Sequence, residues 1–191
     1  MDVFWIHGYE GSSLSQLTEA MGINSPSLYA AFGSKEALFK EALDQYDREE
    51  GAAIQSRLDS RPRLRDAIEA MLEASAICFS EPGRPPGCMV LLSALNCTPG
   101  NAGVWQHLHE RRGRSLDILR ARFLRGLAEG DLPPGCDVEA LTSFYAGIRQ
   151  AMSMQAIDGA SRATLQGLAR AGMLAWDALV GQPATTADAA G

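Results

Sequence analysis

A series of three short helical segments between residues 13 and 39 restricts the fold of this chain more than any other feature. Ser13 is a good N-cap, and Gln16 three residues later can complete a capping box, which predicts that a first helix begins here. Apolar residues at helical spacing give this helix one apolar face. Gly22 follows at the position where a helix ends on a residue with positive φ.

A second helix is predicted directly after this turn. Ser25 is expected as its N-cap and Pro26 at its first helical position, where the missing N–H is no disadvantage. Leu28 and Phe32, four residues apart, are expected to turn inward, and Gly33 to end the helix. A helix, a glycine turn and a short second helix with a polar front are typical of a helix-turn-helix, whose second helix lies in the major groove of DNA.

This segment resembles the N-terminal domain of TetR-family transcriptional regulators in three motifs: Gly8-Tyr9, Met21-Gly22-Ile23 and the longer Leu28-Tyr29-x-x-Phe32-x-x-Lys35-x-x-Leu38. The resemblance is dense over roughly the first quarter of the chain, and the remainder matches in helical layout. It implies a regulator that binds a palindromic operator in double-stranded DNA as a homodimer and responds to a small-molecule effector, with repression as the family's usual mode.

Two positions depart from the family pattern. Members usually have a longer first helix, whereas only residues 1–7 precede Gly8 in this sequence. We therefore expect a shortened first helix, from a late start or a truly short element, in which Phe4 and Trp5 do the remaining packing. Ala31 stands where many members carry a histidine, which removes one contact to the DNA backbone.

The rest of the sequence predicts helices, and no strand pattern or internal repeat is visible. The fold class is therefore all-α, an N-terminal three-helix helix-turn-helix DNA-binding domain followed by a helical ligand-binding and dimerisation domain. We expect the DNA-binding domain to span 1–45, the effector-binding and dimerisation domain 46–180, and a disordered tail of small polar residues 181–191. A long helix over 35–57 is expected to connect the two domains.

Seven residues are expected to lie against DNA: Ser12, Ser13, Ser25, Pro26, Ser27, Tyr29 and Lys35. Tyr29 can offer its ring to a thymine methyl group or its hydroxyl to a phosphate, and Lys35 is the best single phosphate anchor. The structural alternatives are simple capping for Ser13 and Ser25, partial core packing for Tyr29, and an ordinary solvated side chain for Lys35.

The charge distribution argues partly against DNA binding. Residues 1–50 hold three Lys/Arg and nine Asp/Glu, whereas the remaining residues hold fourteen of each. Because phosphate binding draws mainly on positive charge, an acidic head weakens the DNA hypothesis without removing it. The alternative is a homodimeric helical ligand-binding or interaction protein with an impaired DNA-binding head.

Two late helices, over roughly 137–159 and 161–180, carry apolar stripes. The resemblance implies that they form a four-helix bundle between two subunits, and the alternative is that the stripes complete the core of one subunit. The residues expected at the interface are Leu141, Ile148, Leu165, Leu168, Gly172, Trp176 and Leu179.

The resemblance also implies an effector pocket among the middle helices, although each apolar residue there has plain core packing as its alternative. The expected pocket residues are Phe79, Met89, Leu92, Trp105, Phe123, Phe144, Tyr145 and Met152. Cys88 and Cys97 are candidates for a thiol sensor, since Cys88 lies at an expected helix N-terminus close to Arg84, which lowers a thiol pKa. Their alternative is that of small buried hydrophobes.

The helix expected over 101–128 carries a basic stretch, with six arginines and one acid between residues 111 and 125. It indicates either a solvated face paired with acids elsewhere or attraction for an anionic effector or DNA. The arginines are Arg111, Arg112, Arg114, Arg120, Arg122 and Arg125.

Composition and motifs exclude several classes of protein. The sequence contains no GxGxxG, GxxxxGK[ST], HExxH, GxSxG or CxxC motif, so we expect no enzyme, no cofactor and no metal site. The apolar fraction of 46% is that of a globular protein, and no apolar run has the ~18 residues of a membrane span. No leader peptide is evident, and four cysteines without disulfide spacing suit a reducing compartment, so we expect a cytoplasmic protein.

Overall fold

The computed structural model describes residues 1–95 and 98–181, and this part of the chain is helical without any strand, which confirms the all-α fold class. The elements in chain order are α1 (Asp2–Gly11), α2 (Leu14–Met21), α3 (Ser25–Phe32), α4 (Lys35–Tyr46), the π-helical turn η1 (Asp47–Gly51), α5 (Ala52–Asp59), α6 (Leu64–Phe79), α7 (Met89–Leu95), the 3₁₀ turn η2 (Pro99–Asn101), α8 (Ala102–Glu129), α9 (Val138–Ile157), α10 (Arg162–Leu174) and α11 (Trp176–Val180).

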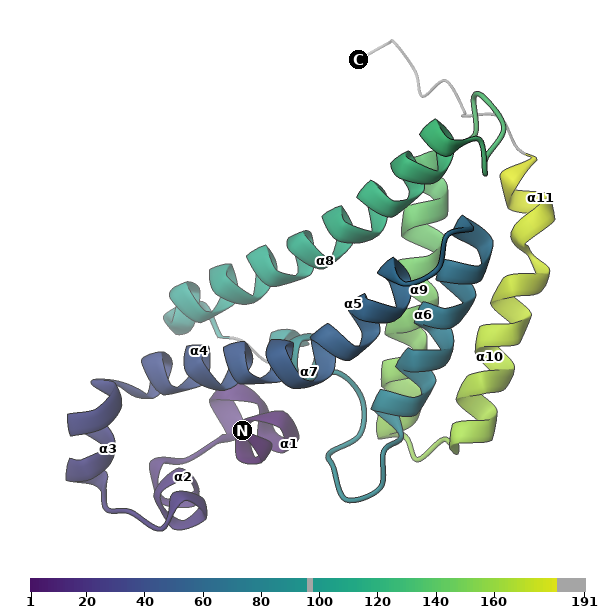
Figure 1. Cartoon of the computed structure of the whole chain (residues 1–191). Coiled ribbons are helices and arrows are strands. Elements are labelled where there is room, and N and C mark those ends of the chain that lie inside the picture. Colours follow the sequence, from purple (N-terminus) through teal and green to yellow (C-terminus); the bar gives the residue numbers. More distant parts are fainter. Residues whose placement is uncertain (96–97, 182–191) are drawn as a thin grey trace.

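The helices form a head and a body joined by two long elements (Figure 1). Helices α1–α3 gather at one end, and α6, α9 and α10 lie side by side at the other. The run of α4, η1 and α5 passes from head to body, and α8 spans the same length beside it. Val104 and Leu108 near the start of α8 belong to the head's core, while Leu119 and Phe123 further along belong to the body's core.

Aromatic side chains of the short first helix pack it into the head, as expected from the sequence. Phe4 and Trp5 are both 1% exposed. The Phe4 ring meets the Phe39 ring edge-on with centroids 5.0 Å apart, and Trp5 meets Tyr46 at 4.8 Å. Each such aromatic pair stabilises the fold by roughly 1 kcal/mol beyond the free energy gained from burying its apolar surface. Two aromatic side chains therefore anchor α1 to α4, the helix that leaves the head.

The connecting helix is continuous but not uniform. The sequence predicts one helix over 35–57, and the structure has helical backbone from Lys35 to Asp59 with a π-helical turn at Asp47–Gly51. A π-helical turn within an α-helix is rare and is often found at functional sites. The domain boundary expected near residue 45 lies next to this turn.

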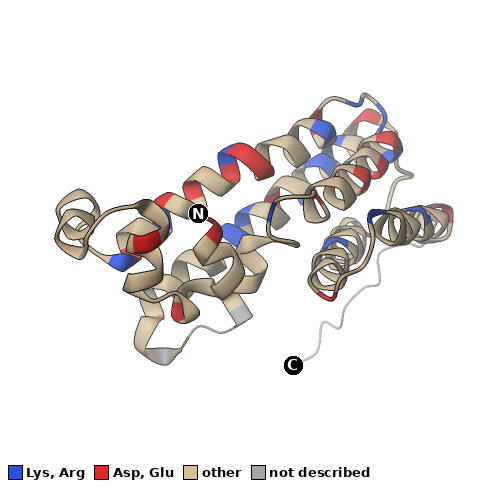
Figure 2. Ribbon diagram, turned by 90° about the horizontal axis from the view of Figure 1, so that it is seen from below, with Lys and Arg blue, Asp and Glu red and all other residues tan. Residues whose placement is uncertain are grey.

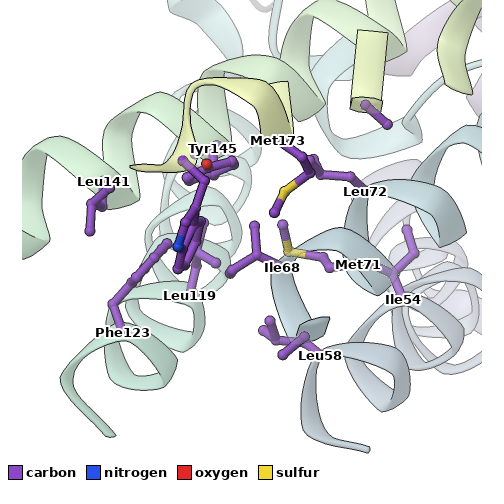
Figure 3. Close-up of a cluster of buried hydrophobic side chains, with 14 of the residues drawn as sticks. Ile54, Leu58, Ile68, Met71, Leu72, Leu119, Phe123, Leu141, Tyr145 and Met173 are labelled. Carbon is purple, nitrogen blue, oxygen red and sulfur yellow. The ribbon is translucent and has the colours of Figure 1, made fainter. Parts of the chain in front are cut away.

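The body is organised around a cluster of apolar side chains from α5, α6, α8, α9 and α10. Figure 3 shows Leu141, Tyr145 and Phe123 gathered on one side of this cluster and Ile54 and Leu58 on the other. The Tyr145 hydroxyl donates to the carbonyl of Gly172 over 3.3 Å, which fixes α9 against α10.

Helix ends mostly follow the sequence predictions, with two corrections. Ser13 and Gln16 form the expected capping box, and Asp137 caps α9 by accepting from the Ala140 N–H. The N-cap of α3, however, is Asn24 and not Ser25, because the Asn24 side chain accepts from the Ser27 N–H over 2.9 Å. The last predicted helix is divided at Ala175 into α10 and α11.

Two further expectations from the sequence concern the C-terminal tail and membrane spans. The tail expected to be disordered lies outside the described residues from 182 onward. None of the described helices is both long and apolar enough to cross a membrane.

A close approach between the loop before α7 and α9 provides a test of the fold. Gly87 has φ of 76°, and a Cβ built there would lie 2.8 Å from the Ser153 carbonyl oxygen. We expect Gly87→Ala to lower the free energy of unfolding by about 3 kcal/mol, from left-handed strain and overpacking. Urea denaturation measures this change. Gly83→Ala is the matched control, because Gly83 has φ of 81° in open space and should cost only about 1 kcal/mol. Equal losses in the two variants would contradict the close approach.

Candidate nucleic-acid interface and ligand cavity

The start of α2 is a tightly satisfied turn. The Ser13 hydroxyl accepts from the Gln16 N–H, and the Gln16 side chain accepts from the Ser13 N–H over 2.8 Å. Ser12 is 1% exposed, and its hydroxyl donates to the carbonyls of Gly8 and Val3. The Ser12 side chain is therefore bonded to carbonyls of α1 and is not presented to a phosphate, whereas Ser13 is exposed.

Helix α3 presents its polar front to solvent. Ser25, Pro26 and Ser27 are exposed, and the Tyr29 side chain is 45% exposed. Leu28 is fully buried in the core of the head, so its packing fixes which face of α3 points outward. The core alternative for Tyr29 is therefore not what the structure has. The four exposed residues form one surface at the end of the molecule farthest from the body.

Lys35 begins α4 next to this surface. Its ammonium group lies 4.5 Å from the centre of the Tyr9 ring. Partial burial lowers the pKa of Lys35, and the nearby Glu10 carboxylate opposes this effect. The ring and the packing around it restrict the side chain, so Lys35 is a positioned charge and not an ordinary solvated lysine.

The exposed surface of α3 carries no charged residue of its own. Figure 2 shows α3 without a charged residue, as its sequence SPSLYAAF requires. Lys40 is paired with Glu36 over 2.7 Å, which leaves Lys35 as the better placed of the two lysines. Contacts from α3 would therefore rely on hydroxyl groups and on the apolar ring of Tyr29.

Arg111 of α8 fastens the connecting helix to the body. Its guanidinium donates to the carboxylates of Asp44 and Asp47 and, over 3.2 Å, to the carbonyl of Leu43. Its Nε donates to His107 over 3.0 Å. Burial raises the pKa of Asp47, and Arg111 acts in the opposite direction. This cluster, which we call the Arg111 latch, ties α8 to the end of α4 and the start of η1.

A cavity of about 380 Å³ lies beside the latch, between η1, α5, α6, α8 and α9. This volume is within the range of small-molecule sites. Its apolar wall is made by Ile54, Leu58, Met71, Phe79, Leu116 and Leu119. Charged and polar side chains line it as well, among them Tyr46, Asp47, Arg112, Arg114, Arg149 and Gln150.

Of the eight expected pocket residues, all of them described, Phe79 is the one that lines this cavity. Phe123, Tyr145 and Met152 are fully buried in the body core, Met89 is fully buried in the head core, and Leu92 packs against the head core. Trp105 and Phe144 are on the surface, at 45% and 36% exposed. Seven of the expected residues therefore do not line this cavity, and five of these seven pack in or against the cores.

The cysteines are placed differently from one another. Cys88 lines the cavity, and its N–H donates to the Ser153 hydroxyl over 2.8 Å. Arg84, expected to act on Cys88, is paired with the buried Glu50. Cys97 lies outside the described residues. Burial raises the pKa of the Cys78 and Cys136 thiols.

Most residues expected at the dimer interface belong to the core of a single subunit. Leu141, Leu165, Gly172 and Trp176 are buried there, while Ile148, Leu168 and Leu179 pack against that core. The prediction chose the inner stripe of each helix. A second apolar stripe faces outward, formed by Phe144, Gly147, Ala151 and Met154 on α9, by Gly167, Ala171 and Leu174 on α10, and by Ala178 on α11.

Most of this outer stripe, and Arg149 of the cavity, were not singled out in the sequence, whereas Arg111, Arg112 and Arg114 belong to the basic stretch noted there. Leu174 is 86% exposed, and Met154 is 45% exposed. Small residues three and four apart, such as Gly147 and Ala151, were the available signal, since they mark close helix approach as readily as the large residues do. Arg149 was not singled out, because a single arginine next to Gln150 on a helix is typical of a solvated side chain.

Comparison with known proteins shows that the chain is similar in sequence and structure to bacterial regulatory proteins. Residues 1–42 match the model of the bacterial regulatory proteins of the tetR family. The chain is 34% identical to the HTH-type transcriptional repressor ComR of Escherichia coli K12, over 94% of this chain and 86% of ComR. It is 30% identical to the repressor BdcR of the same organism, over 83% of this chain and 76% of BdcR. A solved structure of a cysteine mutant of the TetR-family regulator CifR with 26-bp operator DNA has 43% identity and a TM-score of 0.88, covering 92% of each chain.

Proposed function

This chain belongs to the TetR family of bacterial regulatory proteins and is a DNA-binding transcriptional regulator, and we propose that it represses its target genes as a ligand-responsive homodimer. The outward face of α3 carries this proposal, because Ser25, Pro26, Ser27 and Tyr29 are free of the core at the tip of the molecule. CifR was solved with double-stranded operator DNA, and ComR and BdcR are named repressors. A regulator of this kind works on the chromosome, so we place it in the cytoplasm.

We assign DNA contacts to Ser13, Ser25, Pro26, Ser27, Tyr29 and Lys35. Tyr29 supplies a ring and a hydroxyl to the major groove, and Lys35 supplies the positive charge for a phosphate. Ser12 leaves the set because its hydroxyl is bonded within the head. Ser13 keeps its place as the exposed start of α2, where the helix N-terminus favours a phosphate oxygen.

The outward stripes of α9 and α10 support a homodimer. Four helices, two from each subunit, can bury these stripes in a bundle of small and apolar residues. A two-fold axis through this bundle presents two heads, and a palindromic operator requires two heads at a fixed separation. The helices proposed for dimerisation are therefore those expected from the sequence, but the contact is assigned to their outer faces and not to their inner ones.

The Arg111 latch supports a route from the cavity to the DNA. Asp47 and Arg111 both line the cavity and both belong to the latch that holds the end of α4. A ligand that binds one position of these side chains better than another shifts α4 and the head with it. Because half-sites lie about 34–36 Å apart, a small rotation of each head is enough to weaken operator binding.

Thiol sensing at Cys88 is a second candidate, favoured by the position of Cys88 on the cavity wall. In this case iodoacetamide should label Cys88 faster than the buried Cys136, as measured by peptide mass spectrometry, and labelling should weaken operator binding. Cys97, the other expected sensor residue, stays a sequence prediction. Labelling of Cys88 without any change in operator binding would contradict this role.

Fluorescence anisotropy against the intergenic DNA upstream of the chain's own gene tests the proposed function. We expect binding that survives an excess of scrambled competitor and weakens with salt. Residues 1–45 contain two lysines, Lys35 and Lys40, so a dimer brings four of them to DNA. The slope of log Kobs against log salt should therefore be no steeper than about −4. Equal binding to scrambled DNA would contradict the proposal and favour a dimeric ligand-binding protein with an impaired head.

A further inference from the structure

The cavity is positively charged in a chain whose net charge is −6. Among the described residues that line it are four arginines and one carboxylate, that of Asp47. Asp47 is paired with Arg111, one of the four arginines, in the Arg111 latch. The other three, Arg112, Arg114 and Arg149, form no salt bridge with any described residue.

Arg149 is the most unusual of these side chains. Its Nε is shielded from solvent and has no hydrogen-bond partner among the described residues. The groups that act on it electrostatically are Cys88, Tyr46 and Cys78, and no carboxylate is among them. Burial lowers the pKa of Arg149, but a guanidinium stays protonated in proteins. A shielded guanidinium nitrogen without a hydrogen-bond partner is unfavourable, so its place in a cavity wall points to a ligand that accepts a hydrogen bond from it.

Two neighbours complete an anion-binding site around this charge. Tyr46 places a hydroxyl on the cavity wall beside Cys88, and burial together with its interaction with Cys88 raises the pKa of this hydroxyl well above its usual value. Arg112, from α8, also has a shielded nitrogen without a hydrogen-bond partner, its Nη1. Charged and neutral donors from three helices therefore meet at one cavity, while Leu58, Met71 and Leu119 give it an apolar wall.

We propose that the cavity binds an organic anion with an apolar body, a carboxylate whose charge is held by Arg149 and whose hydrocarbon part lies against the apolar wall. Arginine suits this task because its planar fork matches a carboxylate. The regulatory meaning of this ligand rests on the function proposed above, although its binding does not. The basic stretch of α8 is then divided in purpose, since Arg120 and Arg125 pair with acids outside the cavity while Arg112 and Arg114 face the ligand.

Isothermal titration calorimetry on the full chain without DNA tests this proposal. The probes are two matched pairs, octanoate with octanamide and 4-phenylbutyrate with 4-phenylbutanamide, which differ in charge but hardly in shape. We expect at least one carboxylate to bind about tenfold or more tighter than its amide, since hydrogen bonds to a charged group contribute on this scale. Arg149→Met should abolish that preference, and Arg149→Lys should keep part of it.

Matched variants separate the site from general effects of charge. Arg125→Met removes an arginine of α8 that does not line the cavity, and it should keep the full preference for the carboxylate. Thermal melting of each variant shows that it is folded, and removal of a guanidinium with a shielded, unsatisfied nitrogen should not lower the melting temperature. Arg112→Met should weaken carboxylate binding less than Arg149→Met does.

Three results would overturn the proposal: equal affinity for acid and amide, a preference that survives Arg149→Met, or no binding of either pair. Operator binding with and without the bound carboxylate is measured separately by anisotropy. Failure to bind operator contradicts the proposed function, while the calorimetry alone decides whether the cavity takes an organic anion.

Discussion

Gly147→Arg will convert the chain into monomers and lower its affinity for operator DNA at least about a hundredfold, because two linked heads gain this much from avidity. Gly147 lies on the outer stripe of α9, and a Cβ built there meets nothing within 4 Å in the single subunit. Arginine is a better helix former than glycine, so the subunit itself should not be destabilised. Any loss must therefore come from a charged side chain placed in the contact with a second copy.

Light scattering after size exclusion measures the first part of this result, as a change from twice the chain mass of 20.5 kDa to that mass. Anisotropy measures the second part. Gly113→Arg is the matched control, since Gly113 is also a helical glycine with nothing within 4 Å, but on α8. If the Gly147→Arg protein remained dimeric, the interface would not be formed by the outward stripes of α9 and α10.

Tyr29→Ala will weaken operator binding about 10- to 100-fold, since each subunit loses a contact worth roughly 1 kcal/mol or more. Tyr29 is the large side chain that α3 exposes, at 45%, on a helix without charge. Alanine keeps α3 helical, so unfolding in urea should change little. Lys35→Ala should instead weaken operator and scrambled DNA alike and make the salt slope shallower, because a phosphate contact carries no sequence information.

Met21→Ala is the control for Tyr29, because Met21 is an apolar residue of the same hairpin with 39% exposure at the far end of α2. We expect it to keep operator affinity within about twofold, as surface substitutions do. If Met21→Ala and Tyr29→Ala had equal effects, the loss would reflect the stability of the head and not a contact from α3.

The sequence was most informative where local chemistry decides structure. The capping box at Ser13, the left-handed turn at Gly22 and the helix end at Gly33 are all present, because each depends on residues within four positions. Asn24 was missed as the cap of α3 since Ser25 and Pro26 gave an equally good signal one position later. The helix-turn-helix and the family were thus accessible from about forty residues.

Sites made by distant helices were not accessible in this way. The inner stripe of α10 and α11, with Leu165 and Trp176, has the same periodicity as an interface would, so the pattern alone cannot distinguish a core from a subunit contact. The cavity joins Tyr46, Arg112 and Arg149 from three helices, and no spacing along the chain connects them. The π-helical turn at Asp47–Gly51 likewise has no local sequence signature.

Hydroxyl-radical footprinting on the bound intergenic DNA tests the central claim most directly, that two copies of this chain read DNA through α3. We predict two protected segments related by a two-fold axis, with centres one helical turn or a whole multiple of it apart, and the loss of both with Tyr29→Ala. A single protected segment, or a pair that Tyr29→Ala leaves unchanged, would contradict the account.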